Sequence, residues 1–566
     1  MHAPSRFLTI LAAFVLVCLG GAGAFAASGC GTVVLPSGLG QSDPQGITSL
    51  NPLLTNSIYN KQVIYQLYRP LVWIDRHVNY DPAMSLASTV ETPDGGRTWR
   101  MTIKPWRWSD GVPVTAADVV FTFELIRRIG PGYVLYQVGG IPNLIEHVVA
   151  LSPHEVELKL TRRVNPAWFL RLGLGNSIQP MPEHVFRGMS LREMRARQND
   201  PRLFAVSDSA FLLAEFEVGR HLTLVPNPLY GGTHPHIRRL VVDFLEGGNA
   251  LQALRSGEID AANVPFRLWD LARALPDLRT RTLDGPFGYL SMILNFRSKH
   301  APFLNDTRLR RAIAIAIDQK QLIALAYHGQ ARVTHGPVPP AMTAFLSPQA
   351  RAGYGDLDYD PARARALLDQ AGWKPGADGI RVRDGQRLAF DIEVSSGVVD
   401  RLIILQVAQR ELAAVGIAMA IRGIEFNELF ATLAGNGHDW DSIMIAWTVE
   451  SFPDQQEFFS SDGTQNFGHF RDARMDALNE AVIANAGDEA LHAVQDYAAQ
   501  LQPFIFLPTG AISVLARDGL GGVNDLAAPA GTWSPELLTL SGAMACPDAA
   551  PARDPGETVD AHPVGG

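Results

Sequence analysis

The alternation of hydrophobic and polar residues along the chain predicts short strands separated by helices. Three segments, residues 98–103, 156–160 and 221–225, place apolar side chains at every second position. This period of two is typical of a strand with one buried face. We therefore expect these three segments to be strands in a fold of α/β layers.

The starts of several helices are predicted by capping residues. Thr115 precedes an apolar stripe and has Asp118 three residues later, which is the spacing of a capping box. A second helix is expected after Asp306, where apolar residues recur at i, i+3 and i+4. A third should begin at Asp360-Pro361 and end near Gly372. Helices and strands alternate and no short repeat is present, so the pattern favours an α/β fold class.

Length and charge indicate the number of domains and the class of partner. A chain of 566 residues is too long for one compact core, so two or three domains are expected. Hydrophobic residues make up 47% and charged residues 19%, as in soluble globular proteins. The formal net charge of −9, without a dense run of Lys or Arg, argues against nucleic acid as a partner.

The N-terminus has the pattern of a secretory signal. Arg6 is followed by apolar residues 7–19 and small residues 20–28. No later run of about 18 apolar residues follows, so no membrane span is expected. We predict a signal peptide over 1–26, cleaved after Ala26, and a soluble periplasmic protein after its removal.

Two cysteines would remain after cleavage, Cys30 and Cys546, because Cys18 leaves with the signal. An even pair in an exported protein favours a disulfide. Residues 27–30 also resemble a lipoprotein box, which would instead anchor the protein through a lipid on Cys30. Two unpaired cysteines are the third possibility. The tail at 547–566, rich in Pro, Gly, Ala and Asp, is expected to be disordered.

A search for catalytic motifs finds no phosphate-binding loop, zinc-protease helix, C-x-x-C pair or nucleophile elbow. His234 and His236 form a close pair that could chelate a metal, although Pro235 between them favours a surface loop. Trp106 and Trp108 are candidates for an aromatic platform or for the end of a half-buried strand. We therefore predict a protein that is not an enzyme and uses no cofactor and no metal.

A family resemblance adds a specific expectation. Residues 108–122 read W-S-D-G-V-P-V-T-A-A-D-V-V-F-T, which resembles the signature of the peptide/nickel family of ABC-transporter substrate-binding proteins. The likeness continues in order along the chain from Leu50 to Gly522. The further matching segments are Leu50–Pro52, Asn227–Tyr230, Leu251–Asp260, Asp306–Asp318 and Ala366–Trp373.

The resemblance implies the two-lobed periplasmic binding protein fold of type II, with a ligand cleft between α/β lobes and an extra subdomain inserted in the first. Lobe one is expected at 31–65, 207–280 and 509–546, the inserted subdomain at 66–206 and lobe two at 281–508. The late return to lobe one would bring Cys546 close to Cys30, which supports the disulfide.

The implied function is the extracytoplasmic substrate-binding component of an ABC importer. Such a protein captures small peptides by hinge closure and delivers them, as a monomer, to a permease coupled to an ATPase. The alternatives are the same fold binding a metal chelate, a sugar or another small molecule, a peptide sensor or chaperone, and a hydrolase on a similar scaffold.

Glu450 is the main site residue that the resemblance implies. Peptide-binding relatives hold the ligand ammonium with an Asp three residues after a Trp, and Glu450 stands at that position after Trp447. Asp454 is the alternative anion. The backbone of Ala446 and Thr448 should face the main chain of the ligand.

Further positions are expected to line the cleft by the same resemblance. Asn56 and Ile58 match the opposing segment of lobe one, and Tyr289 and Asn295 match a strand near the hinge. Core packing is an equal alternative for Tyr289. Arg422 is suggested for the ligand carboxylate. The chain also departs from the family at 207–211, where S-D-S-A-F replaces a G-T-G-P-Y turn.

Overall fold

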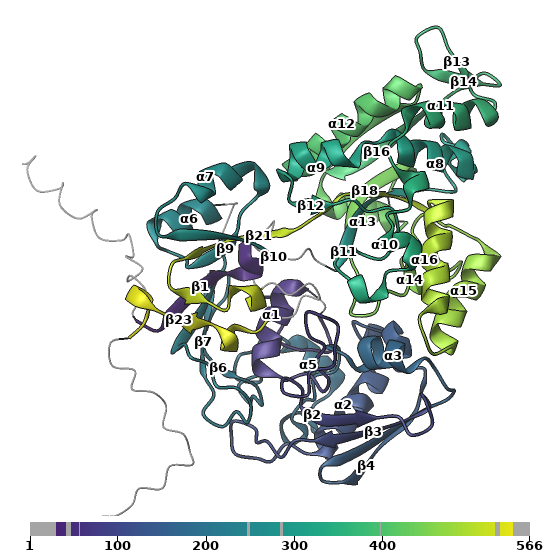
Figure 1. Cartoon of the computed structure of the whole chain (residues 1–566). Coiled ribbons are helices and arrows are strands. Elements are labelled where there is room, and N and C mark those ends of the chain that lie inside the picture. Colours follow the sequence, from purple (N-terminus) through teal and green to yellow (C-terminus); the bar gives the residue numbers. More distant parts are fainter. Residues whose placement is uncertain are drawn as a thin grey trace, which may run out of the picture.

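The computed structural model forms two lobes that face each other (Figure 1). The predicted signal, the C-terminal tail and Asn56 lie outside the residues that the structure describes. The described residues are 30–40, 47–55, 57–245, 249–283, 287–396, 398–435, 437–526 and 533–546.

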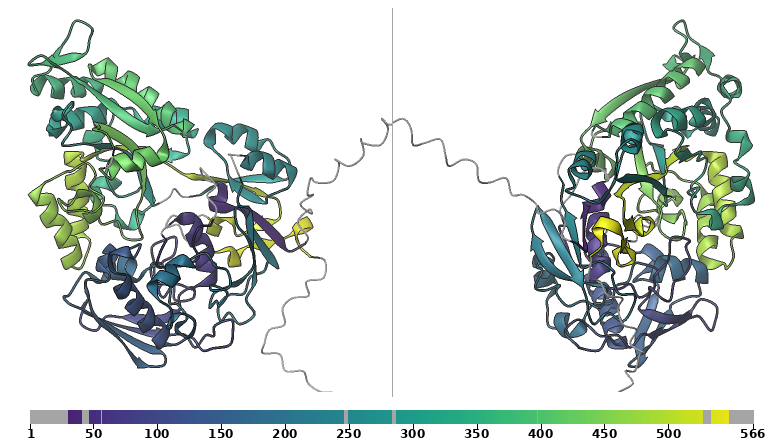
Figure 2. Two further views of the ribbon diagram at one scale, coloured as in Figure 1. Left: turned by 180° about the vertical axis from the view of Figure 1, so that it is seen from behind. Right: turned by 60° about the vertical axis from the view of Figure 1, so that its left-hand side comes forward.

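Lobe one contains two small sheets and combines both ends of the described chain (Figures 1 and 2). Helix α1 (Ile58–Leu67) lies on the side that faces the other lobe. Helices α6 (Ala250–Ser256) and α7 (Trp269–Arg273) cover the second sheet. The first sheet has the order β1 (Thr32–Pro36), β8 (Arg239–Asp243), β7 (His221–Pro226) and β6 (Phe211–Glu217), and the second β10 (Leu278–Leu283), β21 (Ile512–Arg517) and β9 (Ala261–Asn263).

The middle of lobe one carries a subdomain built on one antiparallel sheet. Its strands are β2 (Ala87–Glu91), β3 (Thr98–Ile103), β5 (Glu155–Leu160) and β4 (Ile145–Ser152), in that spatial order. Strands β3, β5 and β7 confirm the three segments predicted from their period of two. The subdomain also holds the helices α2 (Ala116–Ile129), α3 (Pro166–Trp168), α4 (Glu183–Phe186) and α5 (Leu191–Ala196).

Lobe two is a mixed five-stranded sheet flanked by helices. Its order is β17 (Ala418–Ile424), β16 (Ala389–Ser395), β18 (Ser442–Thr448), β11 (Gly288–Leu294) and β19 (Phe504–Leu507). The helices are α8 (Thr307–Ala316), α9 (Gln319–Tyr327), α10 (Pro348–Arg351), α11 (Pro361–Gln370), α12 (Val399–Val415), α13 (Phe426–Leu433), α14 (Gln456–Phe459), α15 (Ala473–Ala484) and α16 (Glu489–Leu501).

Short two- and three-stranded sheets complete the fold. The strand β12 (Ala331–Arg332) pairs with β20 (Thr509–Gly510), which leads from lobe two back to lobe one. The others are a hairpin-like set, β13 (Lys374–Pro375), β14 (Arg381–Arg383) and β15 (Gln386–Arg387), and a pair, β22 (Leu520–Gly521) and β23 (Thr539–Leu540).

The capping predictions are confirmed. The Thr115 side chain accepts a hydrogen bond at the start of α2, and Asp118 accepts from the backbone N–H of Thr115 at 2.8 Å, which completes the capping box. Asp306 caps α8 and Asp360 caps α11, each through its carboxylate. Gly372, just beyond α11, has a φ of +86°, where a glycine is favoured.

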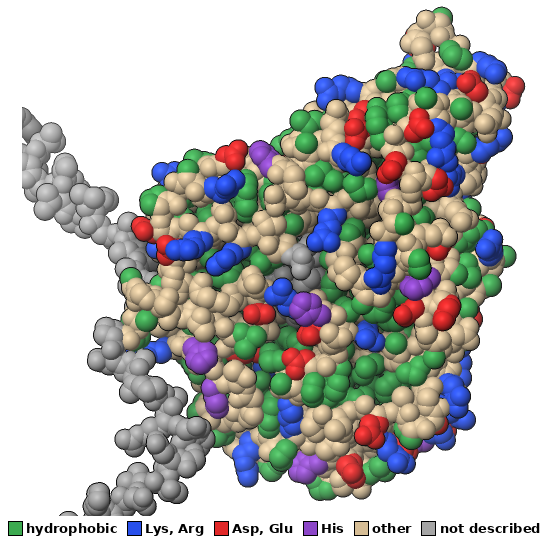
Figure 3. Space-filling view, viewed as in Figure 1, with side chains coloured by type: hydrophobic (Ala, Val, Ile, Leu, Met, Phe, Trp, Pro, Cys, Tyr) green, Lys and Arg blue, Asp and Glu red, His purple; other side chains and the backbone are tan. Residues whose placement is uncertain are grey.

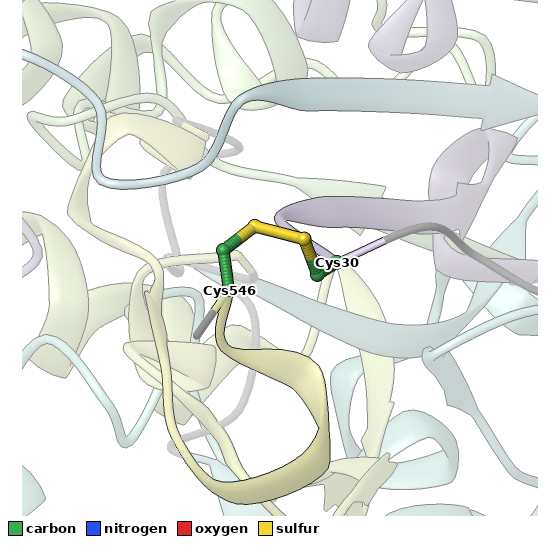
Figure 4. The surroundings of a disulfide bond; sticks show 2 residues. All are labelled: Cys30 and Cys546. Carbon is green, nitrogen blue, oxygen red and sulfur yellow. A yellow bond between two sulfur atoms is a disulfide. The ribbon is translucent and has the colours of Figure 1, made fainter. Parts of the chain in front are cut away.

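Cys30 and Cys546 form a disulfide that links the two ends of the described chain (Figure 4). Their Cα atoms are 4.8 Å apart although 516 positions separate them in the sequence. Cys30 directly precedes the first sheet of lobe one, so the bridge ties the C-terminal segment to that lobe. A sulfur in this bridge is not free to carry a lipid.

The apolar core reaches across the boundary between the lobes. One cluster of buried side chains extends from Leu35 in lobe one, through Trp168 of the inserted subdomain, to Phe452 in lobe two. A second cluster, which includes Met292 and Leu405, lies within lobe two between its sheet and helices. Among the described residues, no helix combines the length and apolar character needed to cross a membrane.

Candidate functional site

Strand β18 of lobe two has one edge that is largely without a strand partner. It pairs with β11 along its whole length, from Ser442 to Thr448. On its other side β16 pairs only with Ser442 and Ile443. The described residues place no further strand along the rest of this edge, and Ala446 and Thr448 are exposed there. An extended ligand could therefore add to the sheet through its backbone.

Trp447 holds the end of β18 in place. Its ring stacks on Phe467, with centroids 6.0 Å apart and an interplanar angle of 16°, and packs against Phe458 at 5.1 Å. The indole N–H is buried and has no hydrogen-bond partner among the described residues. Val449 then donates its backbone N–H to the carbonyl of Phe287 at 2.5 Å. These contacts fix the turn that presents Glu450.

Glu450 is half-buried and faces lobe one. Burial lowers the pKa of the Lys61 ammonium on α1, but the negative charges of Glu450 and Tyr65 together outweigh burial, so that the pKa is raised. Burial raises the pKa of Tyr133 in the inserted subdomain, and the negative charge of Glu450 raises it further. A carboxylate of lobe two thus lies within electrostatic range of a cation and a phenol of lobe one, so Glu450 can attract a positive charge at the boundary between the lobes.

Asp454, the alternative anion, is already used in a contact between the lobes. Its carboxylate accepts a short hydrogen bond from Nε1 of Trp168 in the inserted subdomain. Burial raises the pKa of Asp454 to about 6. Burial also raises the pKa of the neighbouring Glu457 to about 7, with a further contribution from the charge of Asp454. Glu450 is consequently the better placed of the two candidates for a ligand ammonium.

Asn165 adds a second contact between the same two parts of the molecule. Its backbone N–H donates to the carbonyl of Ile483 at 2.7 Å, and its side-chain amide donates to the carbonyl of Val482 at 3.1 Å. Both acceptors lie at the end of α15. The inserted subdomain is therefore docked on lobe two through α3 and its cap.

Tyr289 and Asn295 lie in the interior of lobe two. The Tyr289 hydroxyl donates to Oε1 of Gln455 at 3.5 Å, and its ring packs on Phe506 at 5.2 Å. Asn295 donates to the carbonyl of Trp440 at 2.8 Å and accepts from a backbone N–H on its own loop. These contacts position β11 beside β18. A direct role of either residue in ligand binding stays a prediction.

Two further site predictions cannot be placed. Asn56 lies outside the described residues, and Ile58 begins α1 with a side chain that the structure does not describe. Arg422 is on the outer strand β17, separated from β18 by β16, and pairs with Asp391 at 2.5 Å. Its exposed side chain gives no support to the suggestion that it holds a ligand carboxylate.

The remaining candidates from the sequence have structural roles. Trp106 and Trp108 are buried, and Nε1 of Trp108 donates to Asp118 at 3.5 Å, so the interpretation as an aromatic platform is wrong. His234 and His236 are both exposed. The described residues contain no group of three or more His, Cys, Asp or Glu side chains arranged to hold a metal ion.

The departure at 207–211 is explained by a buried polar cluster that sequence reasoning missed. Asp208 accepts the backbone N–H of Arg69 at 2.9 Å, and Ser209 donates to the carbonyl of Tyr65 at 2.8 Å. The Arg69 guanidinium pairs with Glu536 at 2.8 Å. The polar residues at 207–209 therefore anchor the end of α1, the helix that carries Lys61.

Comparisons with known proteins agree with this architecture. The model of the family described as bacterial extracellular solute-binding proteins, family 5 Middle, matches residues 81–469. The oligopeptide-binding protein AppA of Bacillus subtilis is 24% identical over 439 residues, which are 75% of this chain and 78% of AppA. Protein XP55 of Streptomyces lividans is 25% identical over 454 residues, 76% of this chain and 75% of XP55.

Solved structures share the fold over most of the chain. AppA from Bacillus subtilis, in complex with a nonapeptide, superposes with a TM-score of 0.71 at 21% identity, covering 90% of this chain and 99% of AppA. NikZ from Campylobacter jejuni, in complex with Ni(L-His), gives a TM-score of 0.74 at 20% identity and covers 90% of this chain and all of NikZ. The two-lobed fold predicted from the sequence is confirmed.

Proposed function

Because the chain belongs to the bacterial extracellular solute-binding proteins of family 5, we propose that it is the substrate-binding component of an ABC importer for small peptides. The observation that carries the proposal is the open edge of β18 ending in Glu450. This edge offers backbone hydrogen bonds to an extended peptide, and the carboxylate offers a counter-charge to its amino end.

The position of Glu450 explains how capture would be coupled to closure. An ammonium between the lobes would contact Glu450 from lobe two while lying close to Tyr133 and Lys61 of lobe one. Because Lys61 already lies near this carboxylate, a ligand ammonium favours the closed form to the extent that it interacts with Glu450 more strongly there than in the open form. Lys61 then acts as the internal cation that a ligand ammonium must accompany or displace.

The relatives support a peptide as the ligand but include other cargo. AppA is described with a nonapeptide and NikZ with Ni(L-His). In this chain the described residues hold no His-rich cluster, and the exposed strand edge favours a ligand with a backbone. Delivery to a permease coupled to an ATPase, a monomeric state and a location in the periplasm complete the proposal. In this role the protein binds its ligand without transforming it.

Native mass spectrometry of the protein loaded with a pool of tri- to nonapeptides tests the proposal. We expect a series of bound peptide masses with the natural chain and with the control Glu155→Gln, which changes an exposed carboxylate on β5. Glu450→Gln should weaken binding about 10- to 100-fold, because a hydrogen bond to a charged group contributes about 1.5–3 kcal/mol.

The same measurement separates the alternatives. Peptides acetylated at their amino end should bind the natural chain as weakly as free peptides bind Glu450→Gln. A single non-peptide mass that survives purification and is unaffected by Glu450→Gln would contradict the peptide assignment.

A further inference from the structure

The two lobes touch at a second place, away from the docked helix α3. The short 3-10 turn Phe266–Leu268 of lobe one, which runs directly into α7, packs against α9 of lobe two. The rings of Phe266 and Tyr327 meet edge to face, with their centroids 6.3 Å apart. Nη1 of Arg267 lies 3.5 Å from Oδ1 of Asp400, near the start of α12. We refer to these four side chains as the α7 contact.

Tyr327 places this contact beside the chain that returns from lobe two to lobe one. Its hydroxyl donates to the carbonyl of Pro508 at 3.3 Å. Its ring lies so close to Gly510 that a Cβ atom on this glycine would be 2.6 Å from Cε1 of the ring. Because Gly510 belongs to β20, the strand that leads back to lobe one, the α7 contact lies next to the hinge.

The α7 contact and the docked helix α3 lie against opposite faces of the lobe-two sheet. Successive side chains of a strand point to opposite faces. Along β11, Met292 belongs to the buried cluster of α9 and α12, whereas Ile293 belongs to the cluster that includes α14 and α15. The partners of α3 are on this second face, since Asp454 lies just before α14 and Ile483 is in α15. Figure 1 shows α7 beside α9 above the crossing strand, and α3 below α15.

This arrangement makes the two contacts compete. The chain crosses between the lobes where β11 begins and where β19 and β20 end, at one edge of the same sheet. If lobe two turns about these crossings as a rigid body, a rotation that separates it from α3 moves α9 and the start of α12 towards lobe one. The α7 contact should therefore be tightest when the lobes are open at α3.

In this structure the α7 contact is loose. The paired side chains of Arg267 and Asp400 are still 48% and 31% exposed. Leu271 lies about one helical turn after Arg267, and Val399 directly precedes Asp400, so both flank the ion pair. Each of these two apolar side chains is 51% exposed. A closer approach of the lobes on this side would bury them, and the burial of apolar area is favourable.

The surroundings favour the opposite lobe, rather than another protein, as what covers these side chains. Figure 3 shows hydrophobic and charged side chains interspersed over the upper part of both lobes, where α7 and α12 lie. Binding sites for partner proteins are typically broader and more continuous apolar patches. The two half-exposed side chains are therefore best explained by a contact between the lobes that is only partly formed in this conformation.

We propose that the α7 contact tightens in the open form of the protein and opposes ligand capture, so that its side chains set the ligand affinity without touching the ligand. Closure must overcome the burial of Leu271 and Val399 that the open form gains, and the apparent affinity falls with the fraction of molecules in the closed form. The effect on affinity rests on the proposed function, whereas the effect on the open and closed forms does not.

The double variant Leu271→Ser with Val399→Ser removes this burial chiefly from the open form, because both side chains are half-exposed here. Small-angle X-ray scattering of the ligand-free protein at pH 7.5 should give a smaller radius of gyration than for the natural chain. A pool of tri- to nonapeptides should bind about 3- to 30-fold more tightly. The matched control Val149→Ser with Leu151→Ser, at 39% and 52% exposure on β4, should change neither.

A charge reversal supplies a second test that does not involve apolar side chains. Arg267→Glu places two carboxylates opposite each other, and their repulsion grows as the contact tightens, so this variant should also shift the protein towards the closed form. Arg267→Glu combined with Asp400→Arg restores an attractive pair and should return the radius and the affinity to those of the natural chain. A general loss of stability would not be reversed by the second substitution.

The two measurements distinguish the inference from the proposed function. An unchanged radius and affinity in the double serine variant contradict the inference and leave the peptide receptor standing. A larger radius with weaker binding does the same, because the α7 contact would then hold the closed form together. If no peptide binds any of the proteins but the radius falls as expected, the proposed function fails and the α7 contact still stabilises the open form.

Discussion

Arg69 carries its charge in the interior of lobe one. Its side chain and that of its partner Glu536 are each 1% exposed, and the guanidinium lies 5.2 Å from the ring centres of both Trp73 and Tyr230. Desolvation makes such a pair a weak contributor to stability when intact, but either ion left alone is costly. The pair should therefore affect the free energy of unfolding mainly when one partner is removed and the other ion stays buried.

We expect Arg69→Met or Glu536→Leu alone to lower the free energy of unfolding by about 3–5 kcal/mol, and the two together to cost less than either one. Urea denaturation of the natural chain, the two single variants and the double variant measures the interaction free energy between the two side chains. The exposed pair Arg220–Glu217 is a control that should give about 0–1 kcal/mol. Additive losses for the buried pair would contradict the argument.

The limits of sequence reasoning are visible at these residues. Glu450 and Trp447 could be named because a local spacing identifies them. Arg69 and Glu536 are 467 positions apart, and no local pattern connects them. The same holds for Arg76 and Arg332, which line one cavity although their positions in the sequence are far apart. Arg422 was suggested because it is close in sequence, but β16 separates its strand from β18.

At the scale of elements, the contact between α3 and lobe two sets how firmly the lobes are held together. Trp168 donates to Asp454, whose pKa of about 6 leaves it mostly charged at pH 7.5. A hydrogen bond to a charged group contributes about 1.5–3 kcal/mol. Losing it without losing the apolar packing should move the equilibrium between closed and open forms by about 10- to 100-fold.

Trp168→Phe makes this change. Small-angle X-ray scattering of the ligand-free protein at pH 7.5 should give a larger radius of gyration for this variant than for the natural chain. Trp373→Phe, in the interior of lobe two and packed on Phe303, should leave the radius unchanged. An unchanged radius for Trp168→Phe would mean that the other contacts, such as those of Asn165, hold the lobes together without it.

The elements themselves were well predicted where their signals are local. Local patterns of neighbouring residues determine the alternating strands and the helix caps at Thr115, Asp306 and Asp360, so these could be predicted from the sequence. The order of strands in the sheet of lobe two depends instead on residues that are far apart in the sequence. β19 is a neighbour of β11 although more than 200 residues separate them. The family resemblance implied two α/β lobes but no order of strands.

For the whole molecule, buried carboxyl groups determine how stability depends on pH. Burial raises the pKa of Asp208 and Glu457 to about 7 and that of Asp454 to about 6, against about 4 in an unfolded chain. Between about pH 4 and 7 the folded protein therefore binds more protons than the unfolded one. By linkage its stability must fall as the pH rises through this range.

Below about pH 4 the opposite effect takes over. Desolvation acts to raise the pKa of Asp94, but hydrogen bonds from the backbone and side chain of Thr98 and from the backbone of Arg97 lower it to about 2. The side-chain hydrogen bond and charge of Arg308 lower the pKa of Asp306. Such groups stabilise the fold above their unfolded pKa and lose this contribution as they are protonated. The two trends together predict a maximum of stability near pH 4.

Urea denaturation of the ligand-free protein from pH 3 to 8 should show this maximum, with the free energy of unfolding falling toward pH 7.5. Glu457→Gln removes one of the raised groups while it keeps the side chain's size, so its decline between pH 5 and 7 should be shallower. Glu155→Gln, exposed on β5, should follow the natural chain. A stability that rises steadily from pH 5 to 8 would show that these carboxyls remain charged in the fold, and the boundary between the lobes would then be far better hydrated than its burial implies.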